Sequence, residues 1–364
     1  MNINFTNLYK LIPNKKLLFY KINNLLRNNQ LVGGKEIDNF QKEFSRFVNS
    51  KFTIAVANGT DALEIAIKSL KLKKNSEIIV PANTWISTAA AVVANDLKLI
   101  LCDVNLDDYT ICLSDLKKKI NKKTSCIIPV HLYGNPAHML SIKKIIGKRN
   151  IKIIEDCAQA QGSFINGRHV GTFGDIGTFS FFPSKNIGGI GDGGAIVTKN
   201  KKIFDFCSRY RNHGAIQKYD HKFIGRNSRL DCINSCLIRE KMKKYSQVLK
   251  KRKTLAKIYH KNLKLIKNLK LYNYQKNFSY SYHQFVIRLD RDRDELQSFL
   301  KKKNVETMIH YPYMLNELSF FNYKKKLSNC NMLGKKILSL PISEEHSVKE
   351  INHVCKLIKL FFNK

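Results

Sequence analysis

The sequence is poor in acidic residues, in proline and in tryptophan. Its 364 residues include 28 Asp and Glu against 64 Lys and Arg, with seven prolines and one tryptophan. No segment approaches the roughly eighteen consecutive apolar residues of a membrane-spanning helix, and residues 1–27 lack the separate basic and apolar blocks of a signal peptide. We therefore expect a soluble, cytoplasmic protein without a membrane partner. Because 43% of the residues are hydrophobic, wholesale disorder is excluded.

The cysteines and histidines show no metal-binding or disulfide pattern. The nine cysteines form no CxxC pair and lie mostly within apolar runs, as Cys126 does. This distribution is typical of reduced, buried thiols. The ten histidines have no spacing that indicates a ligand set, so we expect no metal site.

The net charge of +36 first suggests a nucleic-acid partner. However, residues 151–240 carry 13 basic against eight acidic residues, whereas residues 241–303 carry 19 against four. The excess of basic residues lies on helix-like segments such as 245–265, where it is typical of a solvated helix face. We expect no nucleic-acid partner, because no helix-turn-helix pattern is present. A DNA-binding regulator remains the alternative from another class, and it predicts strongly salt-dependent DNA affinity.

Short β-branched runs alternate with amphipathic helical segments from residue 53 to residue 199. This alternation predicts an α/β fold whose mainly parallel sheet is covered by helices on both faces. The last hundred residues mix strand and helix patterns. We expect a large α/β domain over residues 1–240, with an N-terminal extension, and a smaller α+β C-terminal domain over residues 241–364. The predicted strands are 53–57, 77–80, 97–102, 125–130, 151–155, 176–182, 195–198 and 283–289. The predicted helices are 61–72, 84–95, 114–120, 138–148, 229–245, 246–265, 293–303 and 348–362.

The segment Asn58-Gly59-Thr60-Asp61 connects the first of these strands to a helix. A glycine lets a ligand approach the backbone, and the free N–H groups of a first helical turn attract an anion. The same residue types are ordinary helix N-caps, so phosphate binding and capping both remain open.

Two further strand ends carry charged side chains. Asp156, with Gln159 three residues later, follows the apolar run 151–154, where an unpaired carboxylate is costly. Lys185 follows an aromatic strand that contains Ser180, and apolar surroundings lower the pKa of an amine and favour the neutral nucleophile. A capping role for Asp156 and a Lys185 that extends to water are the alternatives.

Trp85, the single tryptophan, lies just past another strand, where it either stacks on a flat ligand or belongs to the core. A phosphate cradle, an aromatic plane, a buried Asp and a desolvated Lys are together the parts that pyridoxal 5'-phosphate requires. The glycine-rich run 188–194 is not a Walker A loop, because no Gly-Lys-Ser/Thr follows it.

Ten sequence motifs extend over nearly the whole chain. They are Val32-Gly33-Gly34 and residues 57–63, 80–85, 129–134, 154–159, 179–186, 191–194, 211–214, 225–231 and 310–312. In these motifs and their order, the chain resembles the DegT/StrS family of pyridoxal-phosphate-dependent nucleotide-sugar aminotransferases. The resemblance implies the aspartate-aminotransferase-like fold, fold type I of pyridoxal-phosphate enzymes, and a homodimer with active sites shared between subunits.

The resemblance also implies roles for single residues. Lys185 and Asp156 would be catalytic, as the lysine of the internal aldimine and the partner of the pyridinium nitrogen. Gln159 would lie near the phenolic oxygen and Trp85 on the ring. The phosphate would be held by Gly59, Thr60 and Asp61 through their N–H groups, by Ser180 and by Asn227 of the partner subunit. Further candidates for contacts to the donor or the sugar are Arg229, His310 and Tyr311. Asn58 stands where the family more often has Ser, a change that we expect to leave the backbone amides unaffected.

The implied reaction is a ping-pong transfer of an amino group, with glutamate as the donor, to a keto-deoxysugar linked to a nucleotide, in amino-deoxysugar or surface polysaccharide synthesis. Sugar dehydration and amination of a cyclitol ketone are the alternatives on the same fold. Some relatives that dehydrate carry histidine at the lysine position, so Lys185 favours transamination. The motifs do not specify the nucleotide, the sugar or the position and stereochemistry of amination.

Overall fold

The computed structural model describes residues 1–323 and 325–363, and within them the largest element is a seven-stranded sheet. Its order is β1-β9-β8-β5-β4-β2-β3, and only β9 runs opposite to its neighbours. The strands are β1 (Phe52–Val56), β2 (Glu77–Pro81), β3 (Lys98–Cys102), β4 (Thr124–Ile127), β5 (Lys152–Asp156), β8 (Ile176–Ser180) and β9 (Gly194–Thr198). The predicted mainly parallel sheet is confirmed.

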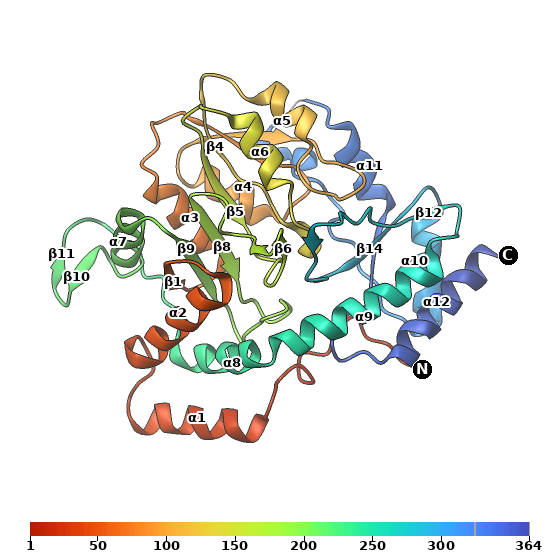
Figure 1. The fold of residues 1–364 in the computed structure, drawn as a ribbon, viewed down its shortest axis with the longest axis horizontal. Coiled ribbons are helices and arrows are strands. Elements are labelled where there is room, and N and C mark those ends of the chain that lie inside the picture. Colours follow the sequence, from red (N-terminus) through yellow and green to blue (C-terminus); the bar gives the residue numbers. More distant parts are fainter. Residues whose placement is uncertain (324, 364) are drawn as a thin grey trace.

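Helices cover both faces of this sheet (Figure 1). One face packs against α3 (Gly59–Ser69), α4 (Ile86–Val93) and α7 (Lys201–Tyr210). The other packs against α2 (Gly34–Val48), α5 (Leu113–Lys119), α6 (Met139–Ile146) and α8 (Cys232–Lys243). In β1 the side chains alternate, because Ile54 and Val56 join the first of these cores and Ala55 the second. Burial on both faces explains why the strands read as continuous apolar runs.

The C-terminal part has its own core around a second sheet, β12 (Leu269–Lys270), β14 (Phe285–Leu289) and β15 (Ile337–Leu340). Its helices are α9 (Tyr245–Leu263), α10 (Arg293–Lys302), α11 (Ser328–Lys336) and α12 (Val348–Phe362). In Figure 1, α9 runs from α8 to this sheet, and both chain ends lie near α12. The start of the chain bonds here through Ile3 and Val305, while α1 (Lys15–Arg27) packs on α8. The division at residue 240 stays a prediction.

Short elements complete the fold. They are β6 (Phe164–Ile165), β7 (Arg168–His169), β13 (Phe278–Ser279), the hairpin β10 (Ala215–Gln217) with β11 (Asp220–His221), and the 3₁₀ turns Leu132–Gly134, Leu315–Glu317 and Ser319–Phe321. In Figure 1 the β10–β11 hairpin projects from the body of the protein beside α7.

Helix starts follow from capping residues. Asn58 accepts the N–H of Asp61 and begins α3, and Asp231 accepts the N–H of Asn234 and begins α8. Ser347 and Glu350 form a capping box that begins α12. The predicted start of α8 at Arg229 was three residues early, because Asp231 caps the helix.

The cysteines are free, and all but the half-buried Cys112 are buried, as predicted. Across residues 1–323 and 325–363, none of the helices combines the length and apolarity that crossing a bilayer requires.

Candidate active site

A cavity of about 450 Å³ lies at the carboxyl ends of the central strands. This is where an open α/β sheet binds its ligands, because the loops that follow parallel strands meet at one edge. Nine of the residues predicted from the sequence line it together: Gly59, Thr60, Trp85, Asp156, Gln159, Ser180, Lys185, His310 and Tyr311. The structure thus brings together residues that lie up to 252 positions apart in the chain.

Asp156 is the last residue of β5, and its carboxylate faces this cavity from a buried position. The Thr88 hydroxyl donates to Oδ2 at 2.8 Å, and the Ala158 N–H donates to Oδ1 at 3.0 Å. Burial raises the pKa of Asp156, and these two donors and the charge of Lys185 offset part of the rise. A carboxylate in this setting can bind a positively charged group, or a group that donates a hydrogen bond, in the cavity.

Lys185 follows β8 and lines the same cavity. Burial lowers the pKa of its amine to about 8, and the negative charge of Asp156 opposes this effect only in part. A substantial fraction of Lys185 is therefore neutral near pH 8, which a nucleophilic or proton-transferring amine requires.

The N-terminus of α3 forms a cradle against Ser180. Among the residues that the structure describes, the N–H groups of Gly59 and Thr60 have no acceptor. A Cβ on Gly59 would lie 2.8 Å from the Cβ of Ser180, so only glycine allows the helix to approach the strand this closely. The Thr60 hydroxyl pairs with that of Ser87 at 2.7 Å. Two free N–H groups at a helix N-terminus, beside a serine hydroxyl, suit a phosphate.

Asp61 differs from the expectation that its N–H group is free to bind the phosphate. Its N–H donates to Oδ1 of Asn58 at 2.8 Å, and its carboxylate binds Arg226 at 2.9 Å outside the cavity lining. The Asn58 side chain occupies the N–H of Asp61 as a helix N-cap, a bond that Ser also makes at this position, so the prediction that Asn58 leaves the backbone amides unaffected stays a prediction.

Gln159, Tyr311 and Trp85 form one wall of the cavity. The Gln159 side chain accepts from the Tyr133 N–H at 2.7 Å and donates to the Tyr311 hydroxyl at 2.9 Å. The Trp85 and Tyr311 rings lie 5.5 Å apart. Trp85 is 58% exposed, which excludes the core alternative and leaves its ring free to cover a ligand.

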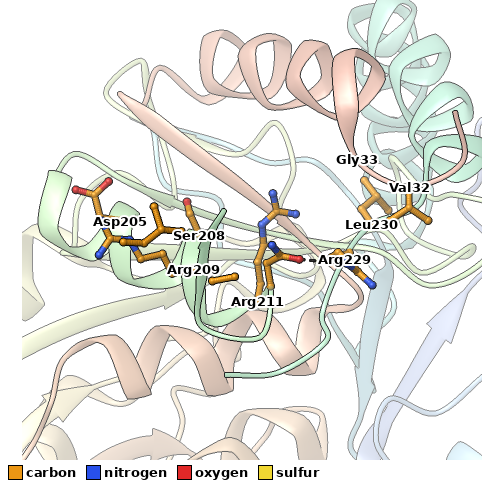
Figure 2. A pocket seen from close by; sticks show the side chains of 11 residues that line it. Val32, Gly33, Asp205, Ser208, Arg209, Arg211, Arg229 and Leu230 are labelled. Atoms are coloured by element: carbon orange, nitrogen blue, oxygen red, sulfur yellow. Dashed lines mark hydrogen bonds between the residues drawn. The ribbon is translucent and has the colours of Figure 1, made fainter. Parts of the chain in front are cut away.

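Arg229 and Asn227 do not line this cavity. Figure 2 shows Arg229 with Arg209 and Arg211 in a second cavity, also of about 450 Å³, where Arg229 donates to Asn212 at 3.1 Å. Asn227 is exposed, and its backbone pairs with that of Asn212. The role of Asn227 of the partner subunit in holding the phosphate stays a prediction.

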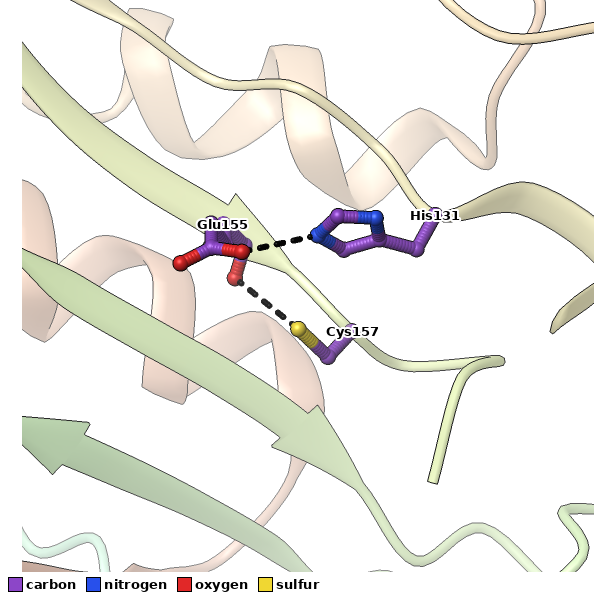
Figure 3. A group of neighbouring side chains, drawn as sticks. All are labelled: His131, Glu155 and Cys157. Carbon is purple, nitrogen blue, oxygen red and sulfur yellow. Dashed lines mark hydrogen bonds and ion pairs between the residues drawn. The ribbon is translucent and has the colours of Figure 1, made fainter. Parts of the chain in front are cut away.

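Figure 3 shows a buried group at the end of β5, in which Glu155 contacts His131 and Cys157. The Ala137 N–H donates to Nδ1 of His131, so Nε2 carries the hydrogen and donates to Glu155 at 3.1 Å. Burial opposes the charge of Glu155, but the bonds from His131 and from the Gly171 and Gly174 amides outweigh it and lower its pKa. The Glu155 carboxylate is thus bonded by His131, Gly171 and Gly174, and the Cys157 thiol donates to the Glu155 backbone carbonyl, so Glu155 ties three segments of the chain together.

The sequence analysis missed several residues that line or support the cavity. Thr88 holds Asp156, and its signal was its position four residues after Thr84, whose hydroxyl it meets at 3.0 Å. His283 and Gln284 enter from the start of β14, and nothing in their sequence context marked them. His310, a predicted residue, pairs with the Ser339 hydroxyl at 3.0 Å, and burial lowers its pKa to about 4.

These residues fit pyridoxal phosphate. The N–H groups at positions 59 and 60 suit its phosphate, Trp85 its ring, Asp156 its ring nitrogen and Lys185 its aldehyde. The cavity volume is adequate for a molecule of that size.

Comparisons with known proteins agree with this geometry. The profile of the DegT/DnrJ/EryC1/StrS aminotransferase family matches residues 14–359. The dTDP-3-amino-3,6-dideoxy-alpha-D-galactopyranose transaminase of Aneurinibacillus thermoaerophilus is 34% identical over 344 residues, which are 93% of this chain and 94% of that protein.

Two solved structures have the same fold. DesV of S. venezuelae, in complex with a ketimine intermediate, has a TM-score of 0.95 and 28% identity over 100% of this chain and 99% of that one. NtdA from Bacillus subtilis, with bound cofactor PMP, has a TM-score of 0.92 and 27% identity. The match covers 100% of this chain and 86% of NtdA. The expected fold and the expected enzyme class, a transaminase, are confirmed, and the chain belongs to the DegT/DnrJ/EryC1/StrS aminotransferase family.

Proposed function

We propose that this protein is a pyridoxal-phosphate-dependent aminotransferase that moves an amino group from glutamate to the ketone of a deoxysugar linked to a nucleoside diphosphate, and that it acts in the cytoplasm. The observation that carries the proposal is the Lys185 amine, with a pKa near 8, in one cavity with the Asp156 carboxylate and the free N–H groups of Gly59 and Thr60. The dTDP-sugar transaminase among the relatives supports the substrate class.

When bound, pyridoxal phosphate supplies an aldehyde that condenses with amines and a ring that withdraws electrons from the adjacent carbon. Asp156 would hold a proton on the ring nitrogen by hydrogen bonding and charge. The Nζ of Lys185 would take a proton from one carbon and return it to the second carbon on the far side of the shared nitrogen, a role that its pKa near 8 favours. Trp85 would cover the ring and Gln159 would bond at its edge, while Gly59, Thr60 and Ser180 would hold the phosphate.

A homodimer is part of the proposal. Large apolar side chains of residues 215–224 are exposed, with Tyr219 at 83% and Ile224 at 95%, as expected for a surface that a second copy covers. Asn227 is exposed three residues later, so docking of the hairpin would carry Asn227 of the partner subunit toward the phosphate. In this arrangement dimerisation completes the site.

A two-step assay tests the function. Purified protein loaded with pyridoxal phosphate is mixed first with glutamate and then with a panel of keto-deoxysugar nucleotides, and the cofactor absorbance is followed. The proposal expects stoichiometric 2-oxoglutarate in the first step and an aminated sugar in the second. Lys185→Ala should abolish both steps. Release of a dehydrated sugar without net use of glutamate would instead indicate the dehydratase, and a lack of reaction with glutamate would contradict the proposal.

A further inference from the structure

His283 lies in the wall of the Lys185 cavity, and the proposed function gives it no role. It immediately precedes Gln284 and β14, so it reaches the cavity from the C-terminal part of the chain. The side chain is 91% buried, and its Nδ1 lies 3.1 Å from Oδ1 of Asn186, the residue after Lys185. Which ring nitrogen carries hydrogen depends on the bonds that Asn186 makes.

The bonds around Asn186 have one consistent direction. Its Nδ2 lies 2.9 Å from the carbonyl oxygen of Ser281, which only accepts, so this side-chain atom is the amide nitrogen. The same Nδ2 donates at 3.2 Å to the Tyr245 hydroxyl, whose own hydrogen goes to the carbonyl of Gln161. The other side-chain atom of Asn186 is therefore the oxygen, which accepts the hydrogen of His283 Nδ1.

This direction fixes the tautomer of His283. With hydrogen on Nδ1, a neutral ring has a lone pair on Nε2 and can only accept there. Nε2 has no hydrogen-bond partner in the part of the chain that the structure describes. Burial, followed by the nearby charges of Lys185 and Arg252 and by His310, holds the pKa of His283 well below its ordinary value, so the ring stays neutral.

We propose that His283 is a specificity-determining residue whose Nε2 accepts a hydrogen bond from a hydroxyl or amino group of the substrate in the Lys185 cavity. The series of hydrogen bonds from Gln161 through Tyr245 and Asn186 to His283 fixes the tautomer that leaves Nε2 as an acceptor. The identity of the substrate as a sugar rests on the proposed function. The tautomer of His283 is independent of that proposal. A substrate with a carbonyl or ether oxygen at this corner would face a second acceptor and bind more weakly.

The first test measures the tautomer in the protein without cofactor. Protein labelled with ¹⁵N-histidine is studied by two-bond ¹H–¹⁵N NMR between about pH 8 and pH 5, the range in which an ordinary histidine titrates, and the signal is assigned by its loss in His283→Gln. The proposal expects a protonated Nδ1 and a bare Nε2 throughout this range. A protonated Nε2, or a ring that becomes doubly protonated near pH 6.5, would overturn it.

The second test separates the two ring nitrogens by substitution. The side-chain oxygen of His283→Gln reaches the position of Nε2, whereas the shorter His283→Asn reaches only that of Nδ1. Loss of one acceptor is worth about 1.4 kcal/mol, so KM for the keto-sugar should rise about tenfold in His283→Asn with kcat unchanged, and less than about threefold in His283→Gln. Cofactor absorbance and Tm confirm that both variants are loaded and folded.

Equal KM values in the two variants, or a loss in kcat alone, would overturn the acceptor role. Failure of the proposed function would show differently, because the wild-type protein would then be inactive while its tautomer still matched the expectation.

Discussion

The Thr88 hydroxyl donates to Oδ2 of Asp156 at 2.8 Å and so links α4 to the end of β5 in the cavity lining. Both side chains are buried, and Thr88 supplies one of the two hydrogen bonds that the Asp156 carboxylate receives within the described part of the chain. The ionisation of Asp156 therefore depends on the hydroxyl of a buried residue in the cavity lining.

Thr88→Val should lower kcat by about tenfold, because it removes one charge-assisted hydrogen bond worth about 1.5 kcal/mol or more while keeping the shape of the side chain. The pKa of Asp156 should rise further, so activity at low pH should fall more steeply than in the wild type. Thr88→Ser, which keeps the hydroxyl, is the matched control for pH–rate profiles. Equal profiles for the Val and Ser variants would show that this bond does not support Asp156.

Gly59→Ala should weaken binding of pyridoxal phosphate by about tenfold or more, because the new Cβ would lie 2.8 Å from the Cβ of Ser180 and displace the cradle. Titration of the cofactor-free protein by absorbance gives the Kd. Gly191→Ala is the control, since nothing lies within 4 Å of its Cβ position. If both variants bind with wild-type Kd, the N-terminus of α3 does not hold the phosphate.

Glu155→Gln should lower the free energy of unfolding at pH 7 by about 3 kcal/mol or more, because it breaks a buried pair with His131 and turns an amide toward the N–H groups of Gly171 and Gly174. Urea unfolding measures the change. The exposed Glu295→Gln is the control and should cost less than about 1 kcal/mol.

The pH dependence of stability supplies a second measure of the contribution of Glu155 to the stability of the fold. Its pKa is lower in the folded than in the unfolded protein, so its contribution is fully present above about pH 4.3 and is lost as pH falls through the folded pKa. The stability difference between wild type and Glu155→Gln should therefore shrink in acid. A difference that is constant with pH would contradict a Glu155 that is ionised and stabilised in the folded protein.

Mixing two inactive variants tests the shared site. Lys185→Ala removes the reactive amine, and Asn227→Ala removes the side chain proposed to reach the partner. If subunits exchange, a mixed dimer has one site with both residues intact, so activity should reappear on mixing. Mixtures without activity, in samples where exchange is shown by mass, would place Asn227 outside the partner's site.

The positions of Asp156, Lys185 and Ser180 could be predicted because each ends or follows a strand of a sheet that the alternating pattern already indicated. The carboxyl ends of parallel strands meet at one edge, so order along the chain translates into proximity. The same argument placed Gly59 and Trp85, which precede or begin helices at that edge.

Other residues depend on packing that the local pattern does not encode. Thr88 lies inside a helix of small residues, and only the approach of α4 to β5 gives it a role. His283 comes from the C-terminal part of the chain, and its function depends on the orientation of the Asn186 amide. The helices α1, α2, α7 and α11 were not predicted, although α2 presents Phe40, Phe44 and Val48 on one buried face.

The most direct test of the account is chemical trapping at Lys185. The protein is incubated with pyridoxal phosphate at several pH values and reduced with borohydride, and the modified peptide is identified by mass spectrometry. The account predicts a single pyridoxyl label on Lys185, with a labelling rate that rises with pH around pH 8, because the neutral amine reacts. An unlabelled Lys185, or a label spread over surface lysines, would contradict it.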